Sequence, residues 1–510
     1  MSDIEQEKAA ASIEHKEHSD HPHHIGFHET DLEPMGLPTE VSPEDNKRIK
    51  RKIDWVLMPI LGVITALQFL DKTMLAYSSI MGFIYDSQIT LSQYSWLGTI
   101  FSLGYLLGSY PMVYLQQRLS FSKVTATCMI MWGAVVMLIT ICHHNFAGLL
   151  VVRFFLGFFE SAMTPACVLV TTQWYRVHEQ GTRTGIWSSC NTWGLIFGSA
   201  VAYGLLHAQI NGHLTGMVGW RVEYLILGSM TIATGIVWVF VIPDDPEKAW
   251  WLSKKDRHLA HLRTADTRQD ITVRDWKWEQ VKEAMADIQI WAFVLVALLT
   301  AIPGGGITNF AAVLVTGLGF GTQEALLMGI GQAWVAPFTI LCLWAGDKLR
   351  CRSLISIFPS IVSMTGAAMI YAFPQSKPIP RAAGYYLMLT WAINTTAVTS
   401  FISSNVAGRT KKTMASGMFF FATCVGGLIG PQTFRSKDAP RYSPALLSII
   451  LCNIFAAAVM ALLFLYYYKE NKRRDARMAA TGETTDVPDG VDALVMDLTD
   501  KENPKFRYVY

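Results

Sequence analysis

The sequence predicts an all-α membrane protein whose twelve transmembrane helices form two pseudo-symmetric six-helix bundles. First, 51% of the 510 residues are hydrophobic and only 16% are charged, which is too apolar for a soluble protein of this length. Second, twelve long apolar runs follow one another along the chain. Third, one polar stretch divides these runs six and six, as expected for two related halves.

Polar segments at both ends and in the middle set the expected domain boundaries. Six histidines between His15 and His28 could bind metal weakly, but the composition favours a solvated tail, so we expect no metal site. The expected domains are a disordered cytoplasmic tail (1–52), an N-terminal bundle (53–242), a cytoplasmic loop (243–288), a C-terminal bundle (289–468) and a cytoplasmic tail (469–510). The expected spans are 54–83, 92–117, 122–142, 146–175, 183–207, 221–242, 289–317, 323–345, 353–373, 382–408, 413–434 and 443–468.

Basic residues in the loops set the expected orientation, because cytoplasmic loops carry more Lys and Arg than the opposite loops. The run Lys47–Lys52 precedes the first span, whereas the loops after spans 1, 3, 5 and 7 hold almost no basic residue. We therefore expect a multi-pass protein with both termini in the cytoplasm, monomeric and in the plasma membrane. The N-terminus has no apolar signal-peptide core, so the first span must itself direct insertion.

Two adjacent charges inside the first span are candidates for chemistry. Asp71 and Lys72 lie about 24 Å along a helix from Trp55, in the middle or outer half of a bilayer. A functional interpretation makes Asp71 a proton-titrating carboxylate and Lys72 a cation that binds an anion. In the alternative, the span ends here and both side chains reach the interface by snorkelling.

The fourth span contains the stretch Arg153–Pro165, in which two charges lie among apolar side chains. Helical spacing puts Arg153 and Glu160 on one face, but two turns, about 10.5 Å, separate them, so a direct ion pair is not expected. A charge in the bilayer costs at least about 2.5 kcal/mol on insertion scales and usually serves an ion or substrate path. We expect Glu160 to exchange protons, and Arg153 either to take part in coupling or to pack.

Three other spans offer segments that could line a substrate cavity. Span 7 holds Pro303–Gly306 and then Asn309. A helix break here would leave backbone N–H groups, including that of Gly305, free to face an anion. The alternative is a kink that lets neighbouring helices pack closely. Span 5 supplies Asn191 and span 10 supplies Asn394 as polar lining, with helix packing and interhelical hydrogen bonds as the alternative.

Other classes of function find no support in the sequence. We find no nucleotide-binding loop, zinc-protease motif or serine elbow, so we expect no enzyme, and no cofactor beyond a proton gradient as energy source. Nothing indicates nucleic-acid binding. Most of the eight cysteines lie inside apolar runs and none shows zinc-site spacing, which is typical of packing residues.

Five segments together resemble a known transporter family. They are Phe69–Lys72, Arg153–Pro165, Pro303–Gly306, Gly430–Phe434 and Ala439–Tyr442. Over about residues 50–470 the chain looks like the major facilitator superfamily and, within it, like the fungal anion:cation symporters of the allantoate permease group. The resemblance implies two six-helix halves that take up a small organic anion, such as allantoate, nicotinate or another carboxylate, together with protons.

The resemblance also implies roles for individual residues. In related anion symporters the span 1 aspartate and the span 4 glutamate couple protons, and these positions match Asp71 and Glu160. The basic residue after the aspartate binds the substrate carboxylate, and here it is Lys72 where relatives often have Arg. Lysine offers a point charge in place of a bidentate fork, so the geometry of the bound anion should differ.

We therefore expect proton-coupled uptake of a small organic anion across the lipid bilayer by alternating access. Proton-antiport efflux of a secondary metabolite or drug is the alternative, although span 5 lacks the Gly-Pro signature of antiporters between Gly185 and Gly204. A non-transporting nutrient sensor is the second alternative, although the tails are modest for proteins of that kind.

Overall fold

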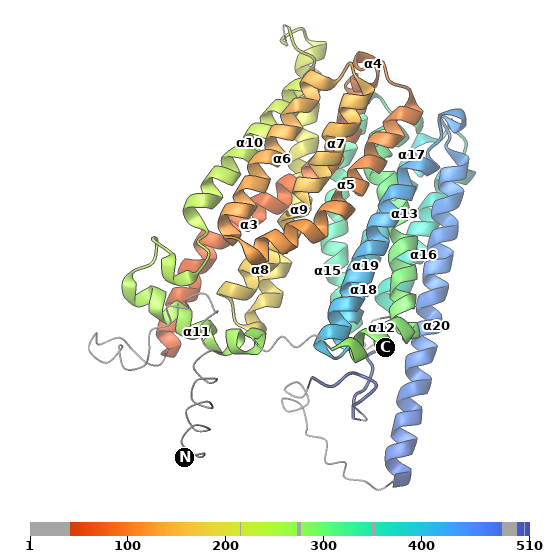
Figure 1. The fold of residues 1–510 in the computed structure, drawn as a ribbon. Coiled ribbons are helices and arrows are strands. Elements are labelled where there is room, and N and C mark those ends of the chain that lie inside the picture. Colours follow the sequence, from red (N-terminus) through yellow and green to blue (C-terminus); the bar gives the residue numbers. More distant parts are fainter. Residues whose placement is uncertain (1–40, 215, 273–276, 349–352, 482–496, 504) are drawn as a thin grey trace, which may run out of the picture.

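A computed structural model describes residues 41–214, 216–272, 277–348, 353–481, 497–503 and 505–510. The His-rich segment His15–His28 lies outside the described residues. Within the described ranges the regular secondary structure is helical, and Figure 1 shows the long helices running side by side. The all-α prediction is therefore confirmed.

The N-terminal half is built from apolar helices whose starts are fixed by capping side chains. Ser42 accepts a hydrogen bond from the backbone N–H of Asp45 at the start of α3, and Thr90 forms a capping box with Gln93 at the start of α5. The helices of this half are α3 (Pro43–Ile80), α4 (Phe83–Asp86), α5 (Leu91–Arg118), α6 (Phe121–Cys142), α7 (Phe146–Glu160), α8 (Met163–Trp174), α9 (Val177–Ile210) and α10 (Gly219–Val241).

The C-terminal half follows two shorter polar helices of the central loop, α11 (Lys254–Thr272) and α12 (Trp278–Ala286). In this half the expected spans 8 and 10 are each divided between two helices, as span 4 is in the first half. The helices are α13 (Ile288–Gly317), α14 (Thr322–Gly331), α15 (Val335–Lys348), α16 (Leu354–Ala372), α17 (Pro378–Met388), α18 (Trp391–Asn405), α19 (Arg409–Ile429) and α20 (Ser443–Thr481). Short 3-10 turns are η2 (Pro246–Lys248), η3 (Gln332–Trp334), η4 (Gly430–Thr433) and η5 (Ser436–Asp438).

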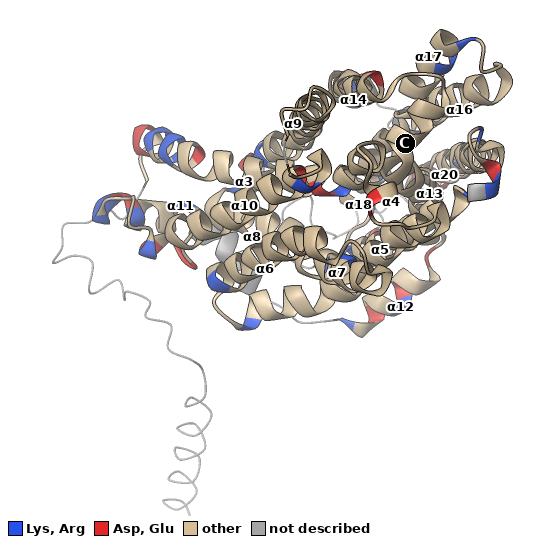
Figure 2. Cartoon of the chain, turned by 90° about the horizontal axis from the view of Figure 1, so that it is seen from above, with Lys and Arg blue, Asp and Glu red and all other residues tan. Residues whose placement is uncertain are grey.

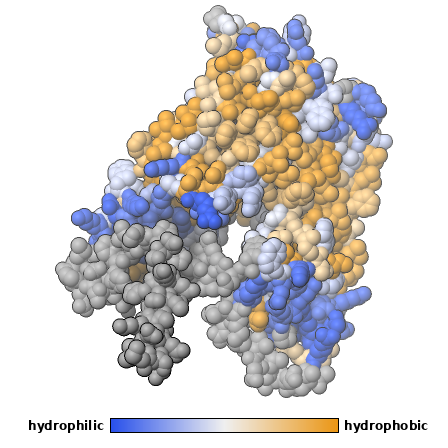
Figure 3. Space-filling view, viewed as in Figure 1, coloured by the Kyte–Doolittle hydropathy of each residue, from blue (hydrophilic) through white to orange (hydrophobic). Residues whose placement is uncertain are grey.

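The helices agree with the expected membrane spans. Within the described residues, 9 helical segments are long and apolar enough to cross a membrane. The remaining expected spans correspond to α5, which carries many polar residues and glycines, to α16, and to α17 with α18. Figure 3 shows hydrophobic residues over the middle of the molecule and hydrophilic residues toward its upper and lower ends, as a membrane protein requires.

The two halves lie beside each other, with α3 against α13, α5 against α19 and α9 against α14. In the view from above, acidic and basic residues are seen on α11 and α12 (Figure 2). We call the side that carries the start of α3, helices α11 and α12 and residues 497–503 and 505–510 the tail side. The side that carries α4 and α17 is the far side (Figure 1).

One sequence expectation about the helices is wrong. The predicted break at Pro303–Gly306 is absent, because α13 runs through this segment without interruption. The glycines serve close packing instead: a Cβ on Gly304 would lie 2.4 Å from the Trp391 ring, and one on Gly306 would lie 2.7 Å from the Phe434 ring. The alternative interpretation, close approach of helices, accounts for these residues.

Described parts of both polar tails form defined structure, which was not expected for the end of the N-terminal tail. Residues 43–52, assigned to a disordered tail, form the first turns of α3. At the other end, α20 continues to Thr481, and residues 497–503 and 505–510 return to pack on the tail side of the C-terminal half. Tyr508, for instance, is 3% exposed and stacks on Tyr467 of α20 with ring centroids 4.9 Å apart.

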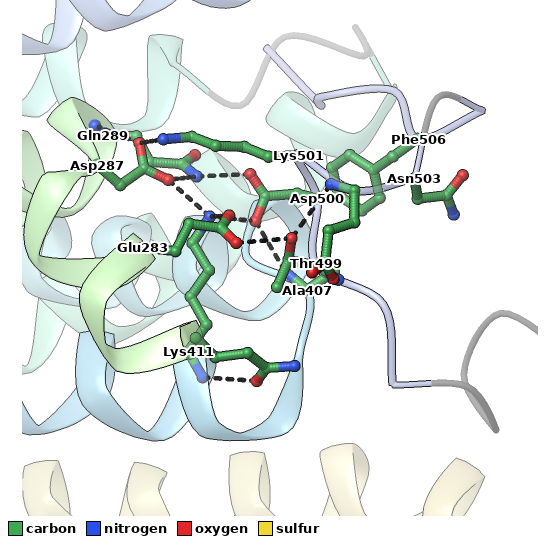
Figure 4. A network of polar contacts seen from close by, with 12 residues as sticks. Glu283, Asp287, Gln289, Ala407, Lys411, Thr499, Asp500, Lys501, Asn503 and Phe506 are labelled. Atoms are coloured by element: carbon green, nitrogen blue, oxygen red, sulfur yellow. Dashed lines mark hydrogen bonds and ion pairs between the residues drawn. The ribbon is translucent and has the colours of Figure 1, made fainter. Parts of the chain in front are cut away.

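A buried lysine fixes this returning segment, as Figure 4 shows. The Nζ of Lys411 lies 2.7 Å from a carboxylate oxygen of Asp287, 2.7 Å from one of Asp500 and 2.8 Å from one of Glu283. The side chains of Lys411, Asp287 and Asp500 have no exposed surface. Burial alone would raise the pKa of Asp287, but the Lys411 ammonium outweighs it and holds that pKa below its ordinary value.

Candidate functional site

The charged pair of the first span lies within a continuous helix. Helix α3 extends beyond Asp71 and Lys72 as far as Ile80, so the pair is not at the end of the helix. Asp71 is 3% exposed, and the Lys72 side chain is 30% exposed. Because adjacent helical residues point about 100° apart, the two side chains meet different neighbours.

Lys72 contacts the glutamate of the fourth span. Its Nζ lies 3.0 Å from Oε1 of Glu160, whose side chain is completely buried at the end of α7. The contact is an ion pair rather than an aligned hydrogen bond, since neither Glu160 oxygen has a hydrogen-bond partner among the described residues. Lys72 also lies over the ring of Tyr105, 5.0 Å from its centroid, which adds a cation–π attraction.

Asp71 and Arg153 have separate partners. The indole Nε1 of Trp132, on α6, donates to Oδ2 of Asp71 at 2.9 Å. The guanidinium of Arg153, which is 3% exposed, donates to the hydroxyl oxygen of Tyr224, on α10, at 2.7 Å. The expectation that Arg153 and Glu160 do not pair is therefore met, and the two predicted acids and two predicted basic residues lie in the interior of the N-terminal half.

Polar side chains of three helices surround the Lys72–Glu160 pair. Gln68, one turn before Lys72 on α3, donates to the hydroxyl of Tyr105 on α5 at 3.5 Å. The hydroxyl of Thr164 on α8 donates to Oε1 of Gln68 at 3.2 Å. These contacts fix the position of Tyr105 over the lysine.

A cavity of about 410 Å³ lies between the two halves and reaches Lys72 and Arg153. Aromatic rings from both halves form much of its wall, and hydroxyl and amide groups are interspersed. Its lining residues are Phe69, Lys72, Phe101, Ser102, Tyr105, Arg153, Ala301, Gly304, Gly305, Thr308, Asn309, Trp391, Ala392, Thr395, Phe420, Thr423, Cys424 and Gly427. A second cavity of about 510 Å³ shares Phe69, Thr308, Trp391 and Ala392 with the first.

The structure brings most, but not all, of the predicted substrate residues to these cavities. Lys72, Gly305 and Asn309 line the first cavity, and Asn191 lines the second. Asn394 lies elsewhere: it is completely buried, and its Nδ2 donates to the hydroxyl oxygen of Ser360 at 2.9 Å. For Asn394 the interhelical hydrogen bond, which was the alternative interpretation, describes the observed contact.

Sequence reasoning missed Trp132, Tyr224 and Glu223. The two aromatic residues are distant in sequence from the charges they contact, so spacing along one helix cannot find them. Glu223 lies on α10, is completely buried, and has no hydrogen-bond partner for either carboxylate oxygen among the described residues. The sequence did offer one signal for Glu223, since a carboxylate near the start of the sixth apolar run, 221–242, marks it as a charge inside a membrane span.

Hydrogen bonds join the two halves between this cavity and the far side. The hydroxyl of Tyr94 donates to the carbonyl of Asn309 at 2.7 Å, and the amide of Gln432 donates to the hydroxyl of Thr99 at 2.9 Å. The ring of Phe310 packs edge-on against that of Tyr94, with centroids 5.1 Å apart, and stacks on that of Phe434, with centroids 4.8 Å apart. These contacts close the molecule on its far side.

Two helical bundles around a central, largely aromatic cavity that Lys72 and Arg153 reach are typical of a membrane transporter. The model of the Major Facilitator Superfamily matches residues 61–431, and the chain belongs to that family. Its fold is the twelve-helix fold of the superfamily, and its named relatives are transporters, so the chain is a transporter and not an enzyme.

Individual relatives confirm the resemblance to the allantoate permease group. The chain is 37% identical to an uncharacterized transporter of Schizosaccharomyces pombe, covering 92% of this chain and 90% of that one. It is 33% identical to the allantoate permease of Saccharomyces cerevisiae, covering 92% and 87%. Among solved structures, a bacterial homologue of the lysosomal transporter Spinster matches with TM-score 0.61 at 18% identity over 80% of this chain and 95% of that one. A D-xylose–proton symporter matches with TM-score 0.60 at 13% identity over 80% and 97%.

Proposed function

We propose that this transporter carries a small organic anion together with protons into the cell. The ion pair between Lys72 and Glu160 supports this most directly. Lys72 lines the central cavity and is held by a buried carboxylate, so an incoming substrate carboxylate must compete with Glu160 for the same ammonium group. Protonation of Glu160 removes that competitor and leaves Lys72 available for the substrate.

The balance of buried charges supports coupling to one proton. With the buried Glu223 carrying its proton, Asp71 and Glu160 offset Lys72 and Arg153, so this set is neutral when these four residues are ionised. An added monoanion leaves one uncompensated negative charge in a place of low dielectric, which costs several kcal/mol. One proton on Glu160 restores neutrality, so binding of the proton and of the anion favour each other.

The cavity favours an anion with an apolar or planar body. Phe69, Phe101 and Tyr105 of the first half face Trp391 and Phe420 of the second across about 410 Å³. Arg153 also lines this space and offers a second cationic group. Two cations among aromatic rings suit a small carboxylate, and the similarity to the allantoate permease makes ureido and heteroaromatic acids the first compounds to test.

Alternating access supplies the transport step. The described conformation is closed on the far side by contacts between the halves, such as Tyr94 with Asn309 and Thr99 with Gln432. We assign this conformation to the state that exchanges substrate with the tail side, and we take the tail side as cytoplasmic because its loops carry more Lys and Arg. Rocking of one half against the other then opens the far side.

Uptake into proteoliposomes under an imposed pH gradient tests the proposal. Wild-type protein should accumulate labelled allantoate or nicotinate when the outside is acidic. Glu160→Gln should lose proton-driven accumulation and retain exchange of substrate, because glutamine has no charge to gain or lose. Glu279→Gln, a neutralised exposed residue of α12, is the matched control and should behave as wild type. Accumulation by Glu160→Gln with the pH dependence of the wild type would reject the assignment.

A further inference from the structure

A basic groove lies on the tail side of the N-terminal half, apart from the central cavity. It measures about 790 Å³, and its walls include Lys47, Arg48, Arg51, Lys52, Trp55 and Trp251. Lys47, Arg51 and Trp55 are spaced i, i+4 and i+8 on α3, so they form one stripe along the exposed helix surface. The stripe ends where α3 enters its apolar segment.

The four basic residues of the groove are not equivalent. Arg48 and Lys52 both bind Asp256 of α11, with nitrogen–oxygen distances of 2.8 and 2.7 Å. Burial alone would raise the pKa of Asp256, but hydrogen bonds and the nearby ammonium of Lys52 hold that pKa below its ordinary value, so the acid stays ionised. Lys47 and Arg51 have no ion-pair partner among the described residues and are exposed. The groove therefore offers two positive charges outside ion pairs. One exposed carboxylate, that of Glu44, also lines it, and its net charge stays positive.

Two tryptophans, Trp55 and Trp251, give the same groove an aromatic wall beside its basic residues. Trp55 is 74% exposed, and Trp250, the residue that precedes Trp251 in the chain, is 68% exposed. Trp251 is held rigidly, since its Nε1 donates to the carbonyl of Val241 at 2.9 Å and its ring stacks on Trp174 at 5.3 Å. Exposed indoles beside an apolar helix segment are typical of the boundary between lipid tails and headgroups.

We propose that this groove binds the headgroup of an anionic phospholipid from the leaflet on the tail side. The phosphate would lie between Lys47 and Arg51, and the start of the acyl chains would lie along Trp55. The charges are complementary, and the aromatic wall fits a lipid better than a free phosphate compound. The site also stands on α3, the helix that carries Asp71 and Lys72, and beside its ion pairs with α11, so an occupied groove strengthens the attachment of that helix at its tail-side end.

Equilibrium binding to the full-length protein in detergent micelles tests this site. The probe is fluorescent dioctanoyl phosphatidylinositol bisphosphate, with dioctanoyl phosphatidylcholine as the neutral lipid and inositol trisphosphate as the free headgroup. Lys47→Gln with Arg51→Gln should weaken binding of the anionic lipid about thirtyfold, because each basic residue near an anionic surface contributes about 1 kcal/mol and 1.4 kcal/mol is tenfold. Phosphatidylcholine should bind much more weakly to the wild type.

The matched control removes two positive charges elsewhere on the tail side. Lys472→Gln with Arg473→Gln, exposed on α20, should change the affinity less than threefold. Equal affinities of the wild type and the Lys47/Arg51 variant would overturn the proposal. Binding of inositol trisphosphate as tight as that of the lipid would also overturn it, because the groove would then be a site for soluble polyphosphates.

Discussion

Replacement of Lys411 by methionine should destabilise the protein strongly. This lysine is the shared partner of Asp287, Asp500 and Glu283, with distances of 2.7 to 2.8 Å. Methionine fills a similar volume but leaves the carboxylates of Asp287 and Asp500, both without exposed surface, with only the more distant ammonium of Lys501, 3.5 Å from Asp287, to offset them. Removing one partner of a buried ion pair costs about 3–5 kcal/mol, and we expect the free energy of unfolding of this variant to fall by an amount in that range.

Chemical denaturation in detergent micelles, followed by tryptophan fluorescence, measures the effect. Lys412→Met is the control: Lys412 is the next residue, but its Nζ donates to the carbonyl of Ser403 and no carboxylate depends on it in the described contacts. The free energy of unfolding of that variant should fall by less than about 1 kcal/mol. Adding Asp500→Asn to Lys411→Met should recover part of the loss. Equal unfolding free energies of Lys411→Met and Lys412→Met would refute the reasoning.

Two further predictions concern acid and packing. The pKa of Asp287 is lower in the folded protein, so its stabilising contribution is complete above its unfolded pKa of about 3.9 and is lost as pH falls through the lower folded value. Chemical denaturation at pH 7, 5, 4 and 3 should therefore show a fall in the free energy of unfolding only at the acid end. The Asp287→Asn variant should lack that fall. Gly304→Ala should lower the free energy of unfolding by about 1–3 kcal/mol and reduce transport, because the added Cβ would lie 2.4 Å from the Trp391 ring. Gly181→Ala, where the added carbon meets open space, is the control and should change neither the stability nor the transport rate. A harmless Gly304→Ala would show that α13 and α18 separate easily.

Most of the fold could be predicted from the sequence because the bilayer imposes it. Long apolar runs must become helices in lipid, so their number and limits are nearly readable from composition. The errors fell where local propensity and packing disagree. Pro303–Gly306 is a weak helix former by itself, yet α13 remains helical there because the glycines allow Trp391 and Phe434 to pack closely.

The candidate site was only half predictable. Charges inside apolar runs identified Asp71, Lys72 and Glu160, because a charge in lipid needs a reason to be there. Their partners lie on other helices: Trp132 on α6 and Tyr224 on α10. Such pairs depend on how helices rotate about their axes, and no spacing rule within one helix determines that.

The proposed neutrality of the four charges of Asp71, Lys72, Arg153 and Glu160 has a consequence for energetics. Under the proposed mechanism one proton and one monoanion cross together, so no net charge moves through the membrane. The membrane voltage, which is worth about 2.3 kcal/mol per charge per 100 mV, then does no work on transport. Only the pH difference drives accumulation, and each pH unit, about 1.4 kcal/mol, limits it to about tenfold. A cell that relies on this transporter would have to acidify its surroundings, rather than polarise its membrane, to concentrate the substrate.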